Sequence, residues 1–186
     1  MHPVQKNSLY DQLMSLPEGL TGEILLGQLH TQPRPSGPHG RVESTLEYEL
    51  FGPFDRGRGG PGGWWILIEP EIHFVVDTEV CVPDIAAWRR ERMPEIPRGH
   101  RFTVTPDWVC EILSPATASK DREIKMPLYA NYGVSYAWLV DPLARTLEAF
   151  ENRDGNWSQI ATHRDDERIS LAPFDAISID LADLWV

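Results

Sequence analysis

A strand, a helix and a second strand follow one another between residues 107 and 141, and this order constrains the fold more than any other feature of the chain. We predict strands over 107–114 (DWVCEILS) and 135–141 (SYAWLVD), with a helix over 119–132 between them. Gly133 provides an end for this helix, and Pro127 is expected to bend it. Two strands that are joined through a helix pair in parallel with a right-handed crossover. The chain therefore contains a sheet with at least one helix packed on it.

The rest of the chain adds two helices and several further strands. Helices are predicted over 8–15 and 39–51, where apolar residues recur at spacings of three and four. Residues 52–63 contain six glycines and are predicted to form a flexible loop. The predicted fold class is α/β (α+β), a mixed sheet flanked by helices. The further strands are expected over 21–29, over 64–69 and 71–76 with Pro70 between them, over 81–88, and in a hairpin of 145–151 with 156–163 that turns at Asp154–Gly155.

Length and composition predict one folded domain over residues 1–186, with a core at about 20–142 and a β-rich extension at about 143–186. The chain is 41% hydrophobic and 24% charged, as is typical of globular proteins. Its two cysteines exclude a disulfide scaffold and a multi-cysteine zinc site. No apolar run approaches the roughly 20 residues of a membrane span, and the N-terminal segment lacks the pattern of a signal peptide. We therefore expect a cytoplasmic protein with no membrane partner.

The formal net charge of −11 argues against a protein that coats nucleic acid without selectivity. The charge is uneven, because residues 88–126 hold eight basic and six acidic side chains. Two interpretations of this basic segment stay open: a solvated loop, or a patch that steers phosphate groups toward an active site. The arginines concerned are Arg89, Arg90, Arg92, Arg98 and Arg101.

Two acidic residues are expected inside apolar strands. Asp84 lies among Val82, Ile85 and Ala86, and Glu111 follows Val109 and Cys110. Strand alternation places Glu111 on the same face as Val109 and Leu113. A buried carboxylate costs several kcal/mol unless it is paired, hydrogen-bonded or bound to a metal. The pair therefore favours a shared ligand, although each acid could also be satisfied by a local partner.

The helix over 119–132 carries Asp121, Lys125 and Tyr129 at i, i+4 and i+8, on one face. Asp121 and Lys125 could form an ordinary surface pair, or Lys125 could overhang the two carboxylates. Carboxylates with a lysine suit phosphodiester hydrolysis, because Mg²⁺ prefers oxygen ligands and lowers the pKa of a bound water. The lysine would orient that water or stabilise charge on the phosphate.

Three segments closely resemble the Uma family of restriction-endonuclease-like proteins, which is placed in the PD-(D/E)XK nuclease superfamily. They are VPDIAAW (82–88), PDWVCEILSPAT (106–117) and DREIKMPLYANYGVSYAWLVDP (121–142). The resemblance implies that Pro83–Asp84 is the proline and acid of the motif and that Glu111 is its second acid. The usual lysine two residues after the second acid is absent, since Leu113 stands there. The family is similar in moving this lysine to the following helix, which here implies Lys125.

The same resemblance implies supporting residues outside the motif. The Gly22–Glu23 pair on the first strand and His39 at the start of the following helix would contribute a ligand or a substrate contact. His39 could equally be an ordinary helix-start residue. Apart from the resemblance, Glu71 could face Asp84 across the predicted hairpin, and one residue of register decides this. Two further expectations concern residues without a role in the site: His73 and His163 lie on strand surfaces, and Cys81 and Cys110 are small buried residues.

The leading hypothesis is a metal-dependent endonuclease that hydrolyses phosphodiester bonds in DNA. Asp84 and Glu111 would hold Mg²⁺ or Mn²⁺, Lys125 would act on the water or the phosphate, and Asp121 and Tyr129 would support them. The alternative is an inactive nuclease-fold binding or assembly module. A Lys125 amine within hydrogen-bond distance of the two acids, directly or through one water, would favour the enzyme over this module. A third interpretation is a structural sheet in which the acids only accept backbone N–H groups. A homodimer is expected by analogy with restriction enzymes.

Overall fold

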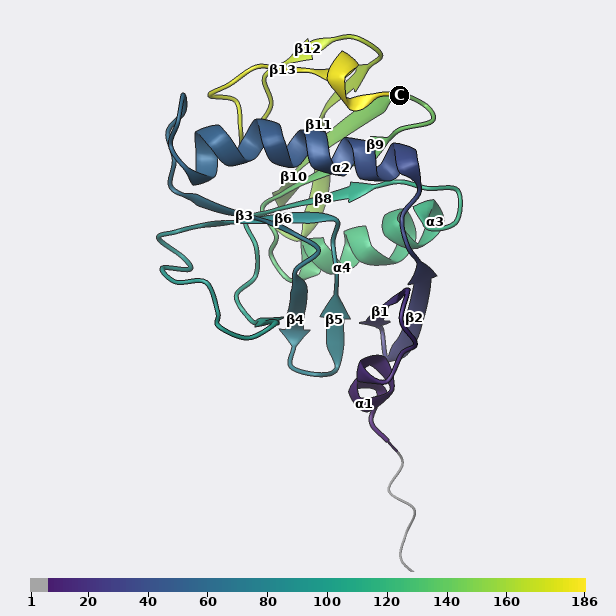
Figure 1. Cartoon of the computed structure of the whole chain (residues 1–186). Coiled ribbons are helices and arrows are strands. Elements are labelled where there is room, and N and C mark those ends of the chain that lie inside the picture. The colour runs from purple at the N-terminus through teal and green to yellow at the C-terminus, as the bar shows by residue number, and fades with distance from the viewer. Residues whose placement is uncertain (1–6) are drawn as a thin grey trace, which may run out of the picture.

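A six-stranded sheet with the strand order β11-β10-β9-β8-β6-β3 forms the centre of the fold (Figure 1). The structure is a computed structural model and describes residues 7–186. Strands β8 and β9 pair in parallel, as the strand–helix–strand order predicts, and the other neighbours pair antiparallel. The strands are β3 (Trp64–Ile68), β6 (Ile85–Arg89), β8 (Trp108–Ile112), β9 (Tyr136–Asp141), β10 (Thr146–Arg153) and β11 (Asn156–Arg164).

Helices cover both faces of this sheet, and strand alternation decides what each helix contacts (Figure 1). Helix α2 (Gly37–Leu50) buries Val42 and Leu46 against the face that carries Cys110. The helical segment between β8 and β9 packs on the opposite face, which carries Val109 and Leu113. This segment consists of α3 (Ala118–Lys120), a π-helical turn (Asp121–Lys125) and α4 (Met126–Asn131). The predicted face of Glu111 is therefore correct, and the fold is of the mixed α+β class that was predicted.

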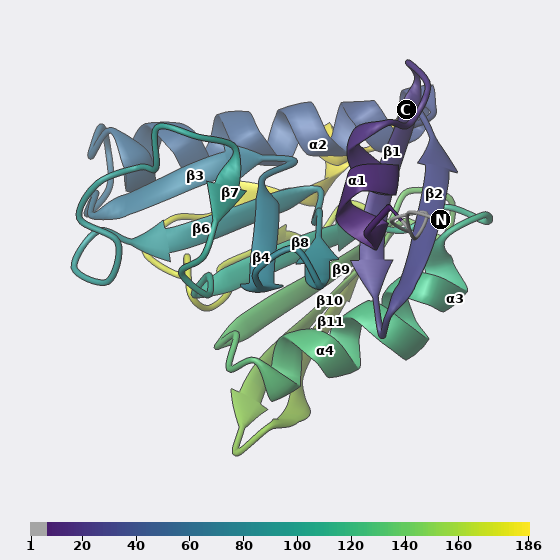
Figure 2. The ribbon, with the colours of Figure 1, turned by 90° about the horizontal axis from the view of Figure 1, so that it is seen from below.

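A second sheet with the order β2-β1-β5-β4-β7 stands beside the first, and α1 packs on it (Figure 2). The chain passes between the two sheets at Pro70 and again at Pro83, because proline lacks the N–H that a continuous strand would need. The predicted strand over 81–88 is therefore divided. The elements of this part are α1 (Leu9–Met14), β1 (Leu20–Leu25), β2 (Gln28–Pro33), β4 (Glu71–Val75), β5 (Glu79–Cys81) and β7 (Arg101–Phe102).

The single strand predicted over 21–29 is wrong, because the chain turns there and forms the β1–β2 hairpin. Leu26 and Gly27 both have positive φ, 52° and 73°, which gives the tight turn. Leucine rarely adopts this conformation, so the sequence offers only half of the usual turn signal. The predicted hairpin at Asp154–Gly155 is confirmed, with φ of 53° and 81° at these two residues.

Two other expectations are corrected. The glycine-rich segment is not a flexible loop throughout, because a π-helical turn over Phe51–Asp55 continues α2 and buries Phe54 and Asp55. His73 is not on the surface: it is 1% exposed, and Asp77 donates its N–H to His73 Nδ1 at 3.0 Å. The buried environment predicted for both cysteines is confirmed.

The chain ends in a small cap on the α2 side of the central sheet (Figure 1). Phe174 of this cap contacts three indole rings, those of Trp64, Trp108 and Trp138, with ring centroids 5.0–5.8 Å apart. Within residues 7–186, no helix has the length and apolarity that crossing a membrane requires. Part of the segment in which no signal peptide was predicted, residues 1–6, lies outside the described residues. The elements of the cap are β12 (Arg168–Ile169), β13 (Ile179–Asp180) and a 3-10 turn (Leu181–Leu184).

Candidate active site

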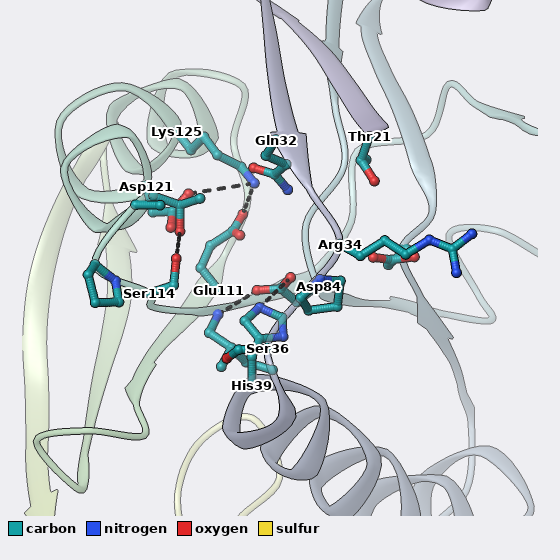
Figure 3. A pocket seen from close by; sticks show the side chains of 16 residues that line it. Thr21, Gln32, Arg34, Ser36, His39, Asp84, Glu111, Ser114, Asp121 and Lys125 are labelled. Atoms are coloured by element: carbon teal, nitrogen blue, oxygen red, sulfur yellow. Dashed lines mark hydrogen bonds and ion pairs between the residues drawn. The ribbon is translucent and has the colours of Figure 1, made fainter. Parts of the chain in front are cut away.

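A cavity of about 290 Å³ opens where the start of α2, the end of β8 and the segment α3–α4 meet (Figure 3). Asp84, Glu111, Asp121, Lys125 and His39 all line it. Asp121 and Lys125 share one π-helical turn, whereas His39 lies on α2, Asp84 directly before β6 and Glu111 on β8, and only the folded chain brings these parts together. The main candidates named from the sequence therefore share one site.

Asp84 stands directly before β6, not inside a strand as predicted, because Pro83 interrupts the pairing. Its Oδ1 lies 3.1 Å from His39 Nε2, and its Oδ2 accepts the Ile112 N–H at 2.5 Å. The hydrogen bond from the Ile112 N–H is of the kind expected if Asp84 served only to accept backbone N–H groups in a structural sheet. Both contacts fix the direction of the Asp84 carboxylate, which points toward the cavity in Figure 3.

Glu111 is 2% exposed, and its Oε1 accepts hydrogen bonds from Tyr129 Oη and Lys125 Nζ. Burial raises the pKa of Glu111 well above its usual range. The positive charge of Lys125 opposes this effect, whereas Asp121 and Asp84 add to it. The Glu111 carboxylate thus sits among like charges, in a position where a further cation would stabilise its ionised form.

Lys125 is 1% exposed and has four oxygen neighbours. Its Nζ lies 2.8 Å from Glu111 Oε1, 2.9 Å from Glu23 Oε1 and 3.9 Å from Asp121 Oδ1. It also donates to the Val82 carbonyl at 3.1 Å. Burial alone lowers the pKa of Lys125, but the carboxylates raise it well above its usual value. Lys125 is therefore an ammonium ion, and the surface-pair interpretation of Asp121 and Lys125 is wrong.

Glu23 on β1 links two lysines. Its Oε1 accepts the Val82 N–H at 2.9 Å as well as contacting Lys125, and its Oε2 lies 2.6 Å from Lys120 Nζ. Although burial raises the pKa of Glu23, the two lysines lower it below its usual value. Sequence reasoning missed Lys120, which also donates to Gln32. Gln32 was missed because strand β2 was missed.

Helix α2 brings a second acid toward Asp84. His39 is 8% exposed, and its Nδ1 has no hydrogen-bond partner among the described residues. Burial and the neighbouring Asp84 and Glu69 carboxylates raise the pKa of Glu43 to about 7. Glu43 and Glu69 were not predicted. The spacing of four residues between His39 and Glu43 on one helix face was the signal that would have indicated the first of them.

The structure does not bring Glu71 into the cavity. Glu71 Oε1 instead accepts a hydrogen bond from Tyr10 Oη at 2.7 Å and lies 2.7 Å from His73 Nε2. Its direction follows the register of β4 with β5, which the sequence left undecided.

None of the arginines of the basic segment lines the cavity. Arg90, Arg92 and Arg101 form ion pairs with Asp55, Asp107 and Asp77, respectively. Arg89 lies over the ring of Trp64. These four arginines therefore contact other parts of the fold, whereas Arg98 is exposed. The steering patch stays a prediction, but none of its arginines lines the cavity.

A mixed sheet covered by helices, with two acids and a lysine converging beside the parallel pair β8–β9, defines a nuclease-like α+β fold. The chain belongs to the Uma2 family, described as "Putative restriction endonuclease", whose model matches residues 9–182. The fold is also that of a crystal structure of "a putative nuclease belonging to DUF820" from Anabaena variabilis. That structure aligns with a TM-score of 0.73 at 21% identity, covering 96% of this chain and 97% of the other. Comparison with curated proteins gives no match.

Proposed function

We propose that the protein is a metal-dependent endonuclease that hydrolyses phosphodiester bonds in DNA. One observation supports this proposal above the others: the Lys125 amine lies 2.8 Å from Glu111 in a cavity that Asp84 also lines. The lysine thus reaches Glu111, the second acid of the motif, although it is 14 positions away from Glu111 in the chain. An inactive binding or assembly module would not need this arrangement, so the contact favours an enzyme.

The donor set fits a hard divalent cation. Asp84 and Glu111 would hold Mg²⁺ or Mn²⁺, and Mg²⁺ commonly takes only one or two carboxylates and keeps several waters. Residues 7–186 contain no group of three or more His, Cys, Asp or Glu side chains arranged to bind a metal. Water and substrate oxygens would therefore supply the other ligands. When bound, the cation would polarise the phosphate and lower the pKa of a bound water.

Neighbouring side chains orient the two acids, and Lys125 offsets part of their negative charge. His39 and the Ile112 N–H hold Asp84, while the Tyr129 hydroxyl holds Glu111. Lys125 is protonated, so it would stabilise negative charge on the phosphate and not accept a proton. Glu23 and Asp121 keep that ammonium ion in place.

Cleavage of supercoiled plasmid DNA with Mg²⁺, with Mn²⁺ or with EDTA tests the proposal. Asp84→Asn and Glu111→Gln are expected to reduce the cleavage rate by about 100-fold or more, because they remove charge from the ligands. The exposed Asp166→Asn is the control, and thermal unfolding checks that every variant folds. Wild-type protein that binds DNA without cutting it would support the inactive module. Equal rates for Asp84→Asn and wild type would contradict the assigned site.

Three further expectations stay predictions: a single domain, a homodimer and a cytoplasmic location. Light scattering during gel filtration tests the dimer, and limited proteolysis tests whether the core at about 20–142 and the extension at about 143–186 form one domain.

A further inference from the structure

The cavity offers a phosphate group few cations. Its lining includes the acids Glu69, Asp84, Glu111 and Asp121, but among residues 7–186 only two Lys or Arg side chains line it, Lys125 and Arg34. Lys125 has three N–H groups and four oxygen neighbours in the protein. In this arrangement it therefore has no spare N–H for a hydrogen bond to a phosphate, and it would act on the scissile phosphate through its charge alone.

Arg34 differs from Lys125 in its exposure and in the number of N–H donors that are free. It lies in the short connection between β2 and α2 and is exposed. No hydrogen bond or ion pair of its guanidinium is found among residues 7–186. Its side chain extends away from Lys125 in Figure 3. A guanidinium presents five N–H donors in a planar fork, which matches two phosphate oxygens.

Arg34 also stands where the cavity continues into a second hollow. Arg34, Thr21, Pro35 and Glu69 line both, and the second hollow is completed by Gly19, Leu20 and Glu43. A nucleic acid strand whose scissile phosphate lies at Asp84 and Glu111 has neighbouring phosphates at regular spacing. Along this path, Arg34 is the cation that one of those phosphates would meet.

We propose that Arg34 binds the DNA phosphate next to the scissile phosphate and so positions the strand that leaves the cavity through the second hollow. The inference rests on the proposed nuclease function and assigns its substrate contact. It also transfers the phosphate-binding role from the basic segment, where Arg90, Arg92 and Arg101 are held in ion pairs, to the connection before α2.

The test measures binding and cleavage of a fluorescein-labelled DNA duplex by wild type, Arg34→Ala and Arg168→Ala. Arg168 is exposed on β12 and lines neither hollow, so its loss changes the net charge equally. Binding is followed by anisotropy with Ca²⁺ in place of Mg²⁺, over a series of salt concentrations. Arg34→Ala is expected to weaken binding about tenfold, and to reduce the slope of log Kd against log salt by about one.

In cleavage with Mg²⁺, Arg34→Ala should raise KM about tenfold and leave kcat within about threefold of the wild-type value, because Arg34 is a positioning residue. Arg168→Ala should change neither quantity. If wild type binds and cuts DNA and Arg34→Ala behaves as Arg168→Ala does, this inference is wrong while the proposed function stands. If wild type neither binds nor cuts DNA, both are overturned.

Discussion

The half-buried carboxyl group of Glu43 should make the stability of the protein depend on pH. Burial, Asp84 and Glu69 raise its pKa from 4.5 to about 7. The folded chain then binds this proton more tightly than the unfolded chain does. The contribution to stability is therefore present below about pH 4.5 and is lost as the pH rises to about 7.

The size of the effect follows from the same shift. One pKa unit corresponds to about 1.4 kcal/mol, so the change from 4.5 to about 7 sets an upper limit of roughly 3 kcal/mol. Glu43 is only partly buried, and solvent screening reduces this figure to about 1–2 kcal/mol. Glu43→Gln cannot ionise, so at pH 8 it should be more stable than wild type by about that amount. At pH 5 the difference should be smaller.

Urea unfolding at pH 5 and pH 8 in EDTA measures both differences. Glu47→Gln is the matched control, because Glu47 lies one turn further along α2, is also partly buried and lines none of the hollows described above. If the free energies of unfolding of Glu43→Gln and Glu47→Gln change equally between the two pH values, the reasoning about Glu43 is refuted.

Three further predictions concern the core and the support of the site. Tyr129→Phe removes a donor to Glu111 and should lower the free energy of unfolding by about 1–3 kcal/mol in urea; no change would show that the hydroxyl is dispensable. Phe174→Ala should cost about 3–5 kcal/mol, since three tryptophan rings surround Phe174, and a loss below about 1 kcal/mol would mean that the C-terminal cap is not part of the core. Gly60→Ala places a Cβ 2.5 Å from a Pro53 side-chain atom and should lower the melting temperature, whereas Gly40→Ala in α2 meets nothing within 4 Å and should raise it.

Local patterns predicted a large part of the fold. The parallel pair β8–β9 followed from the strand–helix–strand order, and the β10–β11 hairpin followed from Asp154–Gly155. The β1–β2 hairpin was missed because Leu26, an unusual residue for positive φ, occupies its turn. That single error also hid the contact of Gln32 with Lys120.

The candidate site was predicted in its identities but not in its contacts. Asp84 and Glu111 stood out because charged groups among apolar neighbours are costly without partners. Lys125 stood out because it shares one helix face with Asp121 and Tyr129 and because of the resemblance to the Uma family. The partners themselves come from elements far away in the chain: Glu23 lies 102 positions before Lys125, yet their side chains are 2.9 Å apart. The spacing of residues along one helix or strand gives no information about contacts between elements that are far apart in the sequence.

The sequence by itself determined the sheet face on which Glu111 lies, the end of the helix before Gly133 and the two acids that need a partner, because these properties depend on neighbours within a few positions. Only the tertiary structure decided which acid pairs with which lysine and that Glu71 turns to Tyr10 and His73. It also decided that Arg90, Arg92 and Arg101 pair with acids of the fold. Register and packing between distant elements set these contacts. If the register of one strand shifted by one residue, the side chains that point into the cavity would point away from it.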